Sequence, residues 1–306
     1  MSTSNGTQDV VSHIADLHFW KVAVNPLRLL NKRFLGNLNV WLRRRHEFLM
    51  EHAEAFAAAV AGTGVRQLLL TGDFTSTALA EEFFLASAFV RGLREHGMQV
   101  HLMPGNHDAY TFEACRARRF ERYFQEFLPP TGYPARVTLH GGTPLLLIPT
   151  AAPNLLTARG RVSGPTLAAV RGLLDGCPDG PVLAAAHYPL LHRTSGYACT
   201  RQHRLRHAAA LRELLGRSGR RILYVAGHVH RFSFVRDDLF PNLTHLTTSA
   251  FFLRRPDAEQ DGEFTEIHAG AGGFTVFRHR HGADWIRELV SCDAGIRTPH
   301  PSCENR

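Results

Sequence analysis

The heptapeptide Gln67-Leu68-Leu69-Leu70-Thr71-Gly72-Asp73 joins a short apolar run to a glycine and an acidic residue. Such a run is typical of a strand buried on both faces, and the glycine permits a tight turn directly after it. The same arrangement recurs along the chain: 10–14 precedes Asp16, 100–103 precedes Gly105-Asn106, 182–186 precedes His187, and 222–225 precedes Gly227-His228. This recurrence predicts buried strands whose carboxyl ends carry polar loops.

Helical patterns lie between these strands, at 45–61, 79–96 and 205–215. Strands that alternate with helices favour an α/β fold with a largely parallel core sheet. Ligands bind such sheets at the carboxyl ends of the strands. Two later apolar runs, at 246–252 and 274–277, are predicted to be strands of a second sheet.

The composition is that of a globular protein, with 44% hydrophobic and 20% charged residues in 306. We expect one domain over residues 8–291, with a basic amphipathic insertion at about 20–45, and a disordered tail over 292–306. The five cysteines are scattered, and the N-terminus has no apolar segment typical of a secretory signal. These features favour a cytoplasmic location. The net charge of +8 predicts an anionic partner.

Candidate metal ligands follow the predicted strands: Asp16 and His18, Asp73, Asn106, His187, and His228 and His230. In D-x-H and H-x-H segments that leave a strand, alternate side chains project to the same side. A mixture of imidazole and carboxylate suits Mn, Fe, Zn or Ni, and a carboxylate can bridge two ions. Each motif alone is a weak signal in a chain with 19 histidines, but all of them together, each after a strand, predict a dinuclear metal site.

This set of motifs resembles the pattern of the calcineurin-like metallophosphoesterases, which is D-x-H, G-D, G-N-H-[DE], a lone H and G-H-x-H. The resemblance implies a four-layer α/β/β/α sandwich. It also implies that Asp16, His18, Asp73 and His230 bind one divalent ion, and that Asp73, Asn106, His187 and His228 bind the other. Manganese is favoured among the possible metals.

By the same resemblance, a hydroxide that bridges the two ions would attack the phosphorus of a phosphodiester or pyrophosphate. His107 would act as general acid or transition-state stabiliser, and Asp108 would orient it. The sequence Gly72-Asp73-Phe74 lacks the V-D-R-G run of protein Ser/Thr phosphatases, so the bacterial diesterase-like branches fit better.

The insertion at 20–45 interleaves bulky apolar residues with seven basic ones. Such a segment can place its apolar side in lipid while its cations meet anionic headgroups, which predicts a possible peripheral association with the inner membrane. An amphipathic segment packed on the domain with solvated arginines is the alternative. Because the segment follows His18 directly, we expect it beside the active-site mouth.

The Asn-Pro-Leu…Asn-Lys-Arg-Phe…Gly pattern within the insertion is similar to bacterial phosphoesterases related to UDP-2,3-diacylglucosamine pyrophosphatases. It implies a phosphorylated small molecule or lipid-linked nucleotide as substrate, with UMP as a product. A 3',5'-cyclic-nucleotide phosphodiesterase is the main alternative, since it would use the same ligands. A nuclease is disfavoured because no aromatic-rich basic strip lies outside the insertion, and a membrane-associated scaffold is disfavoured by the complete ligand set.

Overall fold

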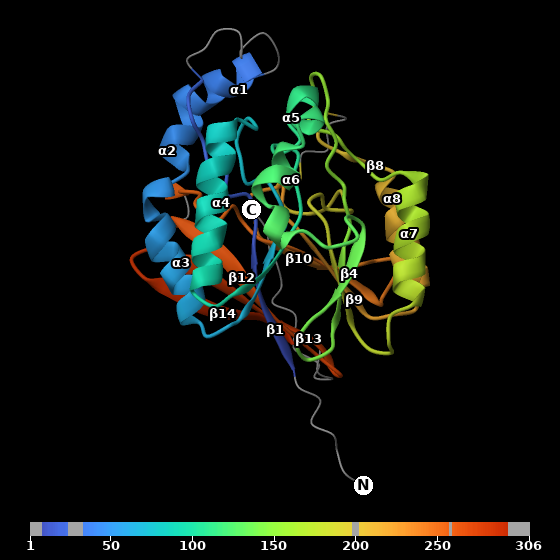
Figure 1. Ribbon diagram of the computed structural model, residues 1–306. Helices are drawn as coiled ribbons and strands as arrows, with labels where there is room; N and C mark the ends of the chain where they lie inside the picture. Colours follow the sequence, from blue (N-terminus) through green and yellow to red (C-terminus); the bar gives the residue numbers. More distant parts are fainter. Residues whose placement is uncertain (1–7, 24–32, 198–201, 257–258, 293–306) are drawn as a thin grey trace, which may run out of the picture.

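The computed structural model describes residues 8–23, 33–197, 202–256 and 259–292. Its strands form two six-stranded sheets (Figure 1). The first sheet has the order β14-β13-β12-β1-β2-β3. Its strands are β1 (Asp9–Ile14), β2 (Gln67–Leu70), β3 (Gln99–Leu102), β12 (Gly262–Gly270), β13 (Gly273–His281) and β14 (Trp285–Cys292).

The second sheet has the order β10-β11-β9-β7-β5-β4. Its strands are β4 (Ala135–Thr138), β5 (Pro144–Leu147), β7 (Val182–Ala185), β9 (Ile222–Ala226), β10 (Ser233–Arg236) and β11 (Leu243–Thr247). The short strands β6 (Gly160–Arg161) and β8 (Leu205–Arg206) pair separately. Both large sheets are mixed, with parallel centres at β1-β2-β3 and at β5-β7-β9-β11.

Helices cover the outer face of each sheet (Figure 1). Beside the first sheet lie α3 (Ala53–Gly62), α4 (Ala80–Glu95), α5 (Phe112–Arg116) and α6 (Arg119–Tyr123), with the short 3₁₀ turns η3 (Met50–His52) and η4 (Gln125–Phe127). Beside the second lie α7 (Gly164–Asp175) and α8 (Ala208–Arg217). The insertion contributes α1 (Arg33–Asn39), a π-helical turn η2 (Val40–Arg44) and α2 (Arg45–Glu47).

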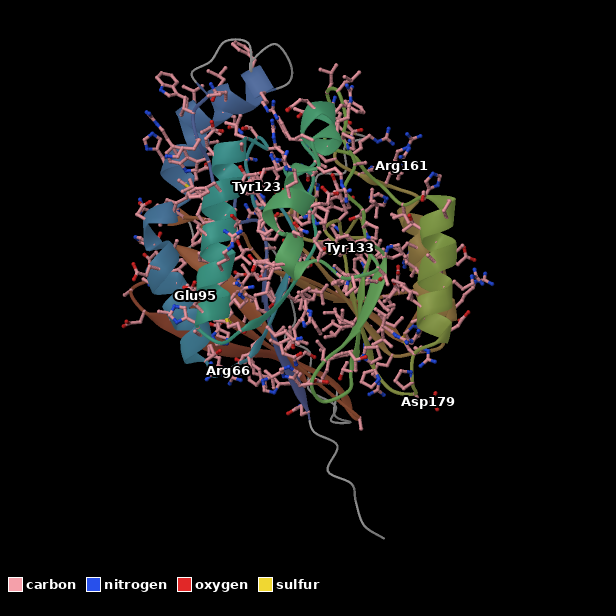
Figure 2. The ribbon with its side chains drawn as sticks, viewed as in Figure 1. Arg66, Glu95, Tyr123, Tyr133, Arg161 and Asp179 are labelled. Atoms are coloured by element: carbon pink, nitrogen blue, oxygen red, sulfur yellow. The ribbon has the colours of Figure 1, made fainter. Side chains whose placement is uncertain are left out.

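Three apolar clusters hold the layers together. One packs helices on the first sheet, around Phe83 and Phe251, and one packs α7 and α8 on the second, around Leu211. The third lies between the two sheets and includes Leu69 and Leu183. Tyr133 lies in the middle of the view of Figure 2, among packed side chains, and its hydroxyl donates to the carbonyl of Leu102. The fold is therefore the predicted α/β/β/α sandwich.

The strands predicted before the candidate ligands are confirmed as β1, β2, β3, β7 and β9, each to within one residue at either end. Two later predictions were right only in part. The run at 274–277 is a strand, within β13, but it pairs with β12 in the first sheet and not in a second one. The run at 246–252 is a strand of the second sheet only as far as Thr247, where β11 ends. Residues 250–252 instead form a buried turn whose backbone joins the end of the insertion, as Leu49 N donates to Phe252 O at 3.0 Å.

This backbone contact also explains why the helix predicted over 45–61 is interrupted. Phe48 pairs with Leu253 in an isolated antiparallel bridge, and its ψ of 108° is extended. A helix cannot continue through a residue whose backbone bonds to another segment. Residues 45–62 are therefore divided into α2, η3 and α3.

The insertion is anchored by buried polar contacts near its start and in its middle. The buried carboxylate of Glu82, at the start of α4, accepts from Lys21 N at 3.2 Å and Thr77 N at 2.8 Å. The buried guanidinium of Arg33 donates to Thr77 O at 3.0 Å and Ala78 O at 3.2 Å. Arg33 is therefore buried, whereas an amphipathic segment packed on the domain was expected to leave its arginines solvated. Residues 24–32 of the insertion, and the predicted tail beyond Cys292 (the last residue of β14), lie outside the described residues.

Candidate metal centre

All seven predicted ligands lie at the carboxyl ends of central strands. Asp16 and His18 follow β1, Asp73 follows β2 and Asn106 follows β3, while His187 and His228 follow β7 and β9 of the other sheet. Because the two parallel centres pack face to face, these loops meet at one edge of the sandwich. The sheet topology therefore brings together residues separated by more than 200 positions.

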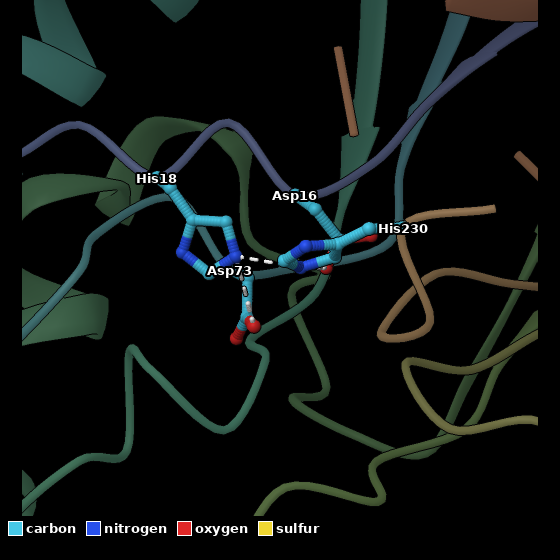
Figure 3. A group of neighbouring side chains, drawn as sticks. All are labelled: Asp16, His18, Asp73 and His230. Carbon is cyan, nitrogen blue, oxygen red and sulfur yellow. Dashed lines mark hydrogen bonds and ion pairs between the residues drawn. The ribbon is translucent and has the colours of Figure 1, made fainter. Parts of the chain in front are cut away.

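Two groups of side chains could each hold a metal ion. The first contains Asp16, His18, Asp73 and His230, whose side chains gather in Figure 3. The Nε2 atoms of His18 and His230 are 2.9 Å apart, and His18 Nε2 lies 3.6 Å from Asp73 Oδ2. Within each group, the candidate ligand atoms all lie within 4.8 Å of one another.

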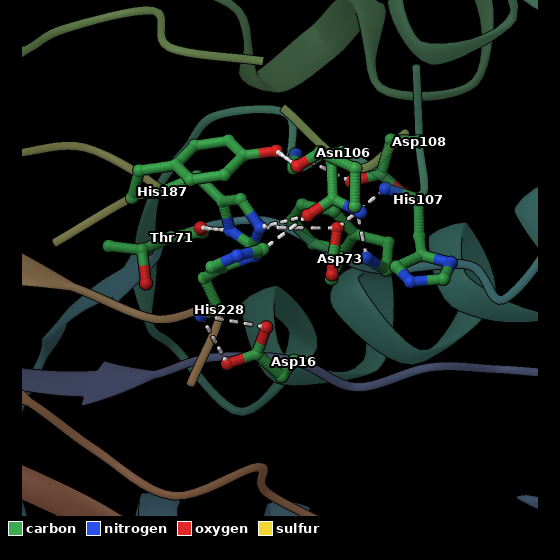
Figure 4. Close-up of polar contacts among 12 residues, drawn as sticks. Asp16, Thr71, Asp73, Asn106, His107, Asp108, His187 and His228 are labelled. Carbon is green, nitrogen blue, oxygen red and sulfur yellow. Dashed lines mark hydrogen bonds and ion pairs between the residues drawn. The ribbon is translucent and has the colours of Figure 1, made fainter. Parts of the chain in front are cut away.

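The second group contains Asp73, His187 and His228, and Asn106 lies beside it (Figure 4). Asn106 Oδ1 is 3.0 Å from His187 Nε2 and 2.8 Å from His228 Nδ1. The other oxygen of Asp73, Oδ1, faces His187 Nε2 at 3.4 Å. Asp73 therefore belongs to both groups and presents a different oxygen to each, which is the geometry of a bridging carboxylate.

Backbone carbonyl groups lie against the imidazole rings of two candidate ligands. His187 Nδ1 lies 2.8 Å from Thr71 O, and His18 Nδ1 lies 3.3 Å from Thr75 O. At His187, the carbonyl at Nδ1 places the hydrogen there and leaves the Nε2 lone pair directed into the centre, as in metal-binding histidines. Imidazole, carboxylate and amide oxygen together form a donor set that fits a dinuclear divalent centre.

The backbone at the site is unusual. Five of the seven candidates have a positive φ: Asp16, His18, Asp73, His228 and His230, at 50° to 71°. This left-handed region is sparsely populated by residues other than glycine, and such strain persists where the surroundings enforce it. The neighbouring glycines are also required. A Cβ at Gly105 would lie 2.2 Å from Asp73 Oδ1, and one at Gly72 would lie 2.4 Å from Gly105 N.

The electrostatics favour neutral imidazoles at most positions. Burial, together with the charge of Arg44, lowers the pKa of His230 to about 3 and holds the pKa of His18 well below its usual range. Burial and the neighbouring His187 lower the pKa of His228. Although burial opposes it, the charge of Asp73 raises the pKa of His187 to about 9. Neutral imidazole is the form that binds metals, and Asp73 already stabilises a positive charge within the centre.

His107 and Asp108 are also at the site, but in different roles. His107 Nδ1 lies 2.6 Å from Ser76 O, and its ring stacks on Tyr110 with centroids 5.3 Å apart. The Asp108 carboxylate does not contact this ring. It accepts instead from Gly105 N at 2.8 Å and Thr75 N at 3.0 Å. The prediction that Asp108 orients the imidazole is corrected: the Ser76 carbonyl does so, while Asp108 joins two ligand-bearing loops.

We expect Asp108→Asn to destabilise the fold by about 1–3 kcal/mol, because buried N–H donors lose a carboxylate acceptor. Chemical denaturation of the metal-free protein would measure this loss. Glu113→Gln, at a carboxylate that is half exposed, is the control and should change stability much less. Equal stability of Asp108→Asn and the unaltered chain would contradict this role.

Sequence reasoning missed Arg44 as a residue of the site. Its guanidinium reaches in from η2, with Nη2 3.1 Å from His107 Nε2 and Nη1 3.2 Å from His18 Nδ1. Burial lowers its pKa, so the arginine is partly desolvated. The expectation that the insertion lies beside the site is confirmed here. The basic run around Arg44 was a signal for phosphate binding, but it did not distinguish Arg44 from its neighbours.

A pocket of about 220 Å³ opens over the centre. Besides Arg44 and candidate ligands, Tyr197 and His203 line it. Tyr197 had no signal in the sequence, and His203 is an exposed residue that forms part of the wall.

Comparisons with known proteins identify the family of this chain. The chain matches the family model of calcineurin-like phosphoesterases over residues 10–232. A sequence comparison with curated proteins gives no match.

Solved structures share the fold at low identity. A dimetal phosphatase from Danio rerio superposes with a TM-score of 0.60 and 13% identity, covering 92% of this chain and 99% of the other. PhoD superposes with a TM-score of 0.62 and 9% identity, covering 94% of this chain and 70% of PhoD. A purple acid phosphatase from yellow lupin (Lupinus luteus) seeds superposes with a TM-score of 0.57 and 12% identity, covering 97% of this chain and 58% of the phosphatase. With the family match over most of its length, the chain belongs to the calcineurin-like phosphoesterases and is a metal-dependent phosphohydrolase.

Proposed function

We propose that this chain hydrolyses a phosphodiester or pyrophosphate bond at a dinuclear centre, with a UDP-2,3-diacylglucosamine-like lipid nucleotide as the substrate class. The observation that carries the reaction class is the position of Asp73 between two groups of ligands. Asp16, His18, Asp73 and His230 would hold one ion, and Asp73, Asn106, His187 and His228 the other. When bound, the ions would supply Lewis-acid activation of the phosphoryl group and of water.

The protein's own groups then bind and orient the phosphate. His107 and Arg44 stand together at the mouth of the centre, with Arg44 Nη2 on His107 Nε2. The Ser76 carbonyl holds the His107 ring so that Nε2, and not Nδ1, faces this opening. A substrate phosphate placed here would accept from the guanidinium and lie beside Nε2. Because the Ser76 carbonyl holds one hydrogen on Nδ1, Nε2 would donate a proton to the leaving oxygen only from the protonated imidazolium form.

We expect Arg44→Gln to lower kcat/KM for a phosphodiester by roughly a hundredfold, since a desolvated cation directed at the developing charge is lost. Steady-state kinetics with bis(p-nitrophenyl) phosphate and Mn²⁺ would measure it. Arg45→Gln removes the same charge one residue away, where Arg45 stacks on Trp41, and should leave the rate within about threefold. Equal losses in both variants would show that only net charge matters.

The outer face of the insertion supports an amphiphilic substrate. Phe34, Leu38, Trp41 and Leu42, spaced as one helical face, have exposed fractions of 56%, 43%, 51% and 59%. The exposed cations Arg43 and Arg45 lie beside them. We propose that this stripe binds an anionic lipid surface, because its apolar side chains can enter the acyl boundary while the arginines meet headgroup phosphates. None of the described helices is long and apolar enough to span a bilayer.

Flotation with liposomes tests the stripe. The protein should float with vesicles rich in anionic lipid, and Trp41→Ser with Leu42→Ser should lower the bound fraction at least tenfold, as each buried apolar side chain is worth about 1.5–3 kcal/mol. Leu239→Ser, at another exposed leucine, is the control. Binding that survives the double substitution would refute this role.

The substrate itself is tested by product analysis with Mn²⁺, offering UDP-2,3-diacylglucosamine in detergent and cyclic AMP in parallel. Release of UMP from the lipid alone would support the proposal. Release of AMP from cyclic AMP alone would favour the cyclic-nucleotide phosphodiesterase, the second candidate, which needs the same metal ligands. Activity on neither substrate would leave the reaction class to be tested with bis(p-nitrophenyl) phosphate.

A further inference from the structure

A second pocket, of about 310 Å³, adjoins the metal centre. Val229 and His230 line both pockets, and Arg43 in the second pocket is the chain neighbour of Arg44 in the first. The two pockets therefore share the wall that carries one candidate metal ligand. A substrate that occupied both pockets would pass His230.

The second pocket is strongly basic. Four of its nine lining residues are arginines: Arg43, Arg231, Arg254 and Arg255. Among the described lining residues there is one carboxylate, Glu47, which lies 2.6 Å from Arg43 Nε, and Arg254 Nε is 3.3 Å from Asp261 Oδ1 at the margin of the pocket. The described lining residues therefore carry more guanidinium groups than carboxylates, and their net charge beside the centre is positive.

Three separate segments bring these arginines together, and backbone contacts fix their spacing. Arg254 N donates to Glu47 O at 2.7 Å, which joins the end of the insertion to the 252–256 loop. Thr247 Oγ1 donates to Arg231 O at 2.9 Å, and so fixes the loop that follows the H-x-H motif. The fold therefore holds together the backbone segments that carry these arginines.

We infer that this pocket binds a second phosphate of the substrate, adjacent to the phosphate that is attacked at the metal centre. This inference rests on the proposed function and narrows it, because a diphosphate carries such a group and a cyclic mononucleotide does not. Guanidinium groups suit the position because their planar N–H donors match phosphate oxygens in pairs.

The direct test is equilibrium binding of two ligands to the Mn²⁺-loaded protein, with free Mn²⁺ in excess. The α,β-methylene analogue of UDP has two phosphate-like groups and cannot be cleaved at its bridge, whereas UMP has one. We expect the analogue to bind at least tenfold more tightly than UMP. In Arg254→Gln/Arg255→Gln this preference should fall to threefold or less. Arg171→Gln/Arg217→Gln, which removes the same charge from exposed positions on α7 and α8, should keep it.

Hydrolysis distinguishes failure of this inference from failure of the proposed function. The unaltered chain should cleave bis(p-nitrophenyl) phosphate, which has a single phosphate, and absence of that activity would overturn the phosphoesterase proposal alone. The second phosphate site would be overturned if the unaltered chain showed no preference for the analogue over UMP. It would also be overturned if Arg254→Gln/Arg255→Gln kept the full preference. Parallel thermal unfolding of both double variants checks that each is folded.

Discussion

Asp73→Asn should lower kcat by roughly three to four orders of magnitude, because the bridging carboxylate of a two-metal centre holds both ions in place. The amide keeps the shape of the side chain but loses one anionic oxygen, and the two oxygens face different histidines, His18 and His187. Both candidate ion sites should therefore weaken together. Steady-state hydrolysis of bis(p-nitrophenyl) phosphate and metal analysis of the same samples would measure the two effects.

The control for this variant is Asp237→Asn, at another buried carboxylate. Asp237 is held by Arg212 at 2.7 Å and by His245 at 2.9 Å, away from the metal centre. It should reduce stability without reducing metal content. Asp73→Asn that binds two equivalents of metal and turns over at the original rate would contradict the assignment of Asp73 as the bridging residue.

His107→Ala should lower kcat by about 10²–10³-fold on a substrate with a poor leaving group, the range typical of losing a positioned proton donor or transition-state contact. The loss should depend on the leaving group. An alkyl phosphodiester needs a proton on its departing oxygen, whereas p-nitrophenolate leaves without one. The ratio of the two rates in variant and unaltered chain is the measurement.

Tyr110→Phe provides the matched control, since it keeps the ring that stacks on His107 and removes only the hydroxyl. It should leave the leaving-group dependence unchanged. A His107→Ala loss that is equal for alkyl and p-nitrophenyl esters would assign His107 to phosphate binding and not to proton transfer.

The grouping of the candidate metal ligands could be predicted because strand ends and loop motifs are local features of the sequence. Each ligand follows an apolar run, and the parallel order of β1-β2-β3 and of β7-β9 brings these ends to one edge. The side-chain partners were harder to predict. Asp108 sits beside His107 in sequence, yet the loop turns its carboxylate toward Gly105 N and Thr75 N. Adjacency in a tight loop does not determine which way a side chain points.

Arg44 and the break at Phe48 depend on contacts between distant segments. The periodicity of 45–61 is helical, but the bond between Leu49 N and Phe252 O overrides it. The same contact follows the end of α2, close to the π-helical turn from which Arg44 reaches the centre while Arg43 and Arg45 stay exposed. The local sequence does not indicate which of the three consecutive arginines at 43–45 points into the site. Similarly, β13 joins the first sheet because it forms a hairpin with β12, a pairing that a short apolar run does not specify.

Because five candidate ligands have a positive φ, substitutions that raise the thermal stability of this protein at these positions would lower its catalytic activity. Glycine at any of these positions would relieve a backbone cost of about 1–2 kcal/mol, at the expense of a metal ligand. A directed-evolution experiment that screened only for thermal stability would therefore enrich glycine at Asp16, His18 or His230 and yield stable but inactive variants. Thermostabilised forms should be sought by a screen that scores turnover at every round, or by holding these loops fixed while the helices vary.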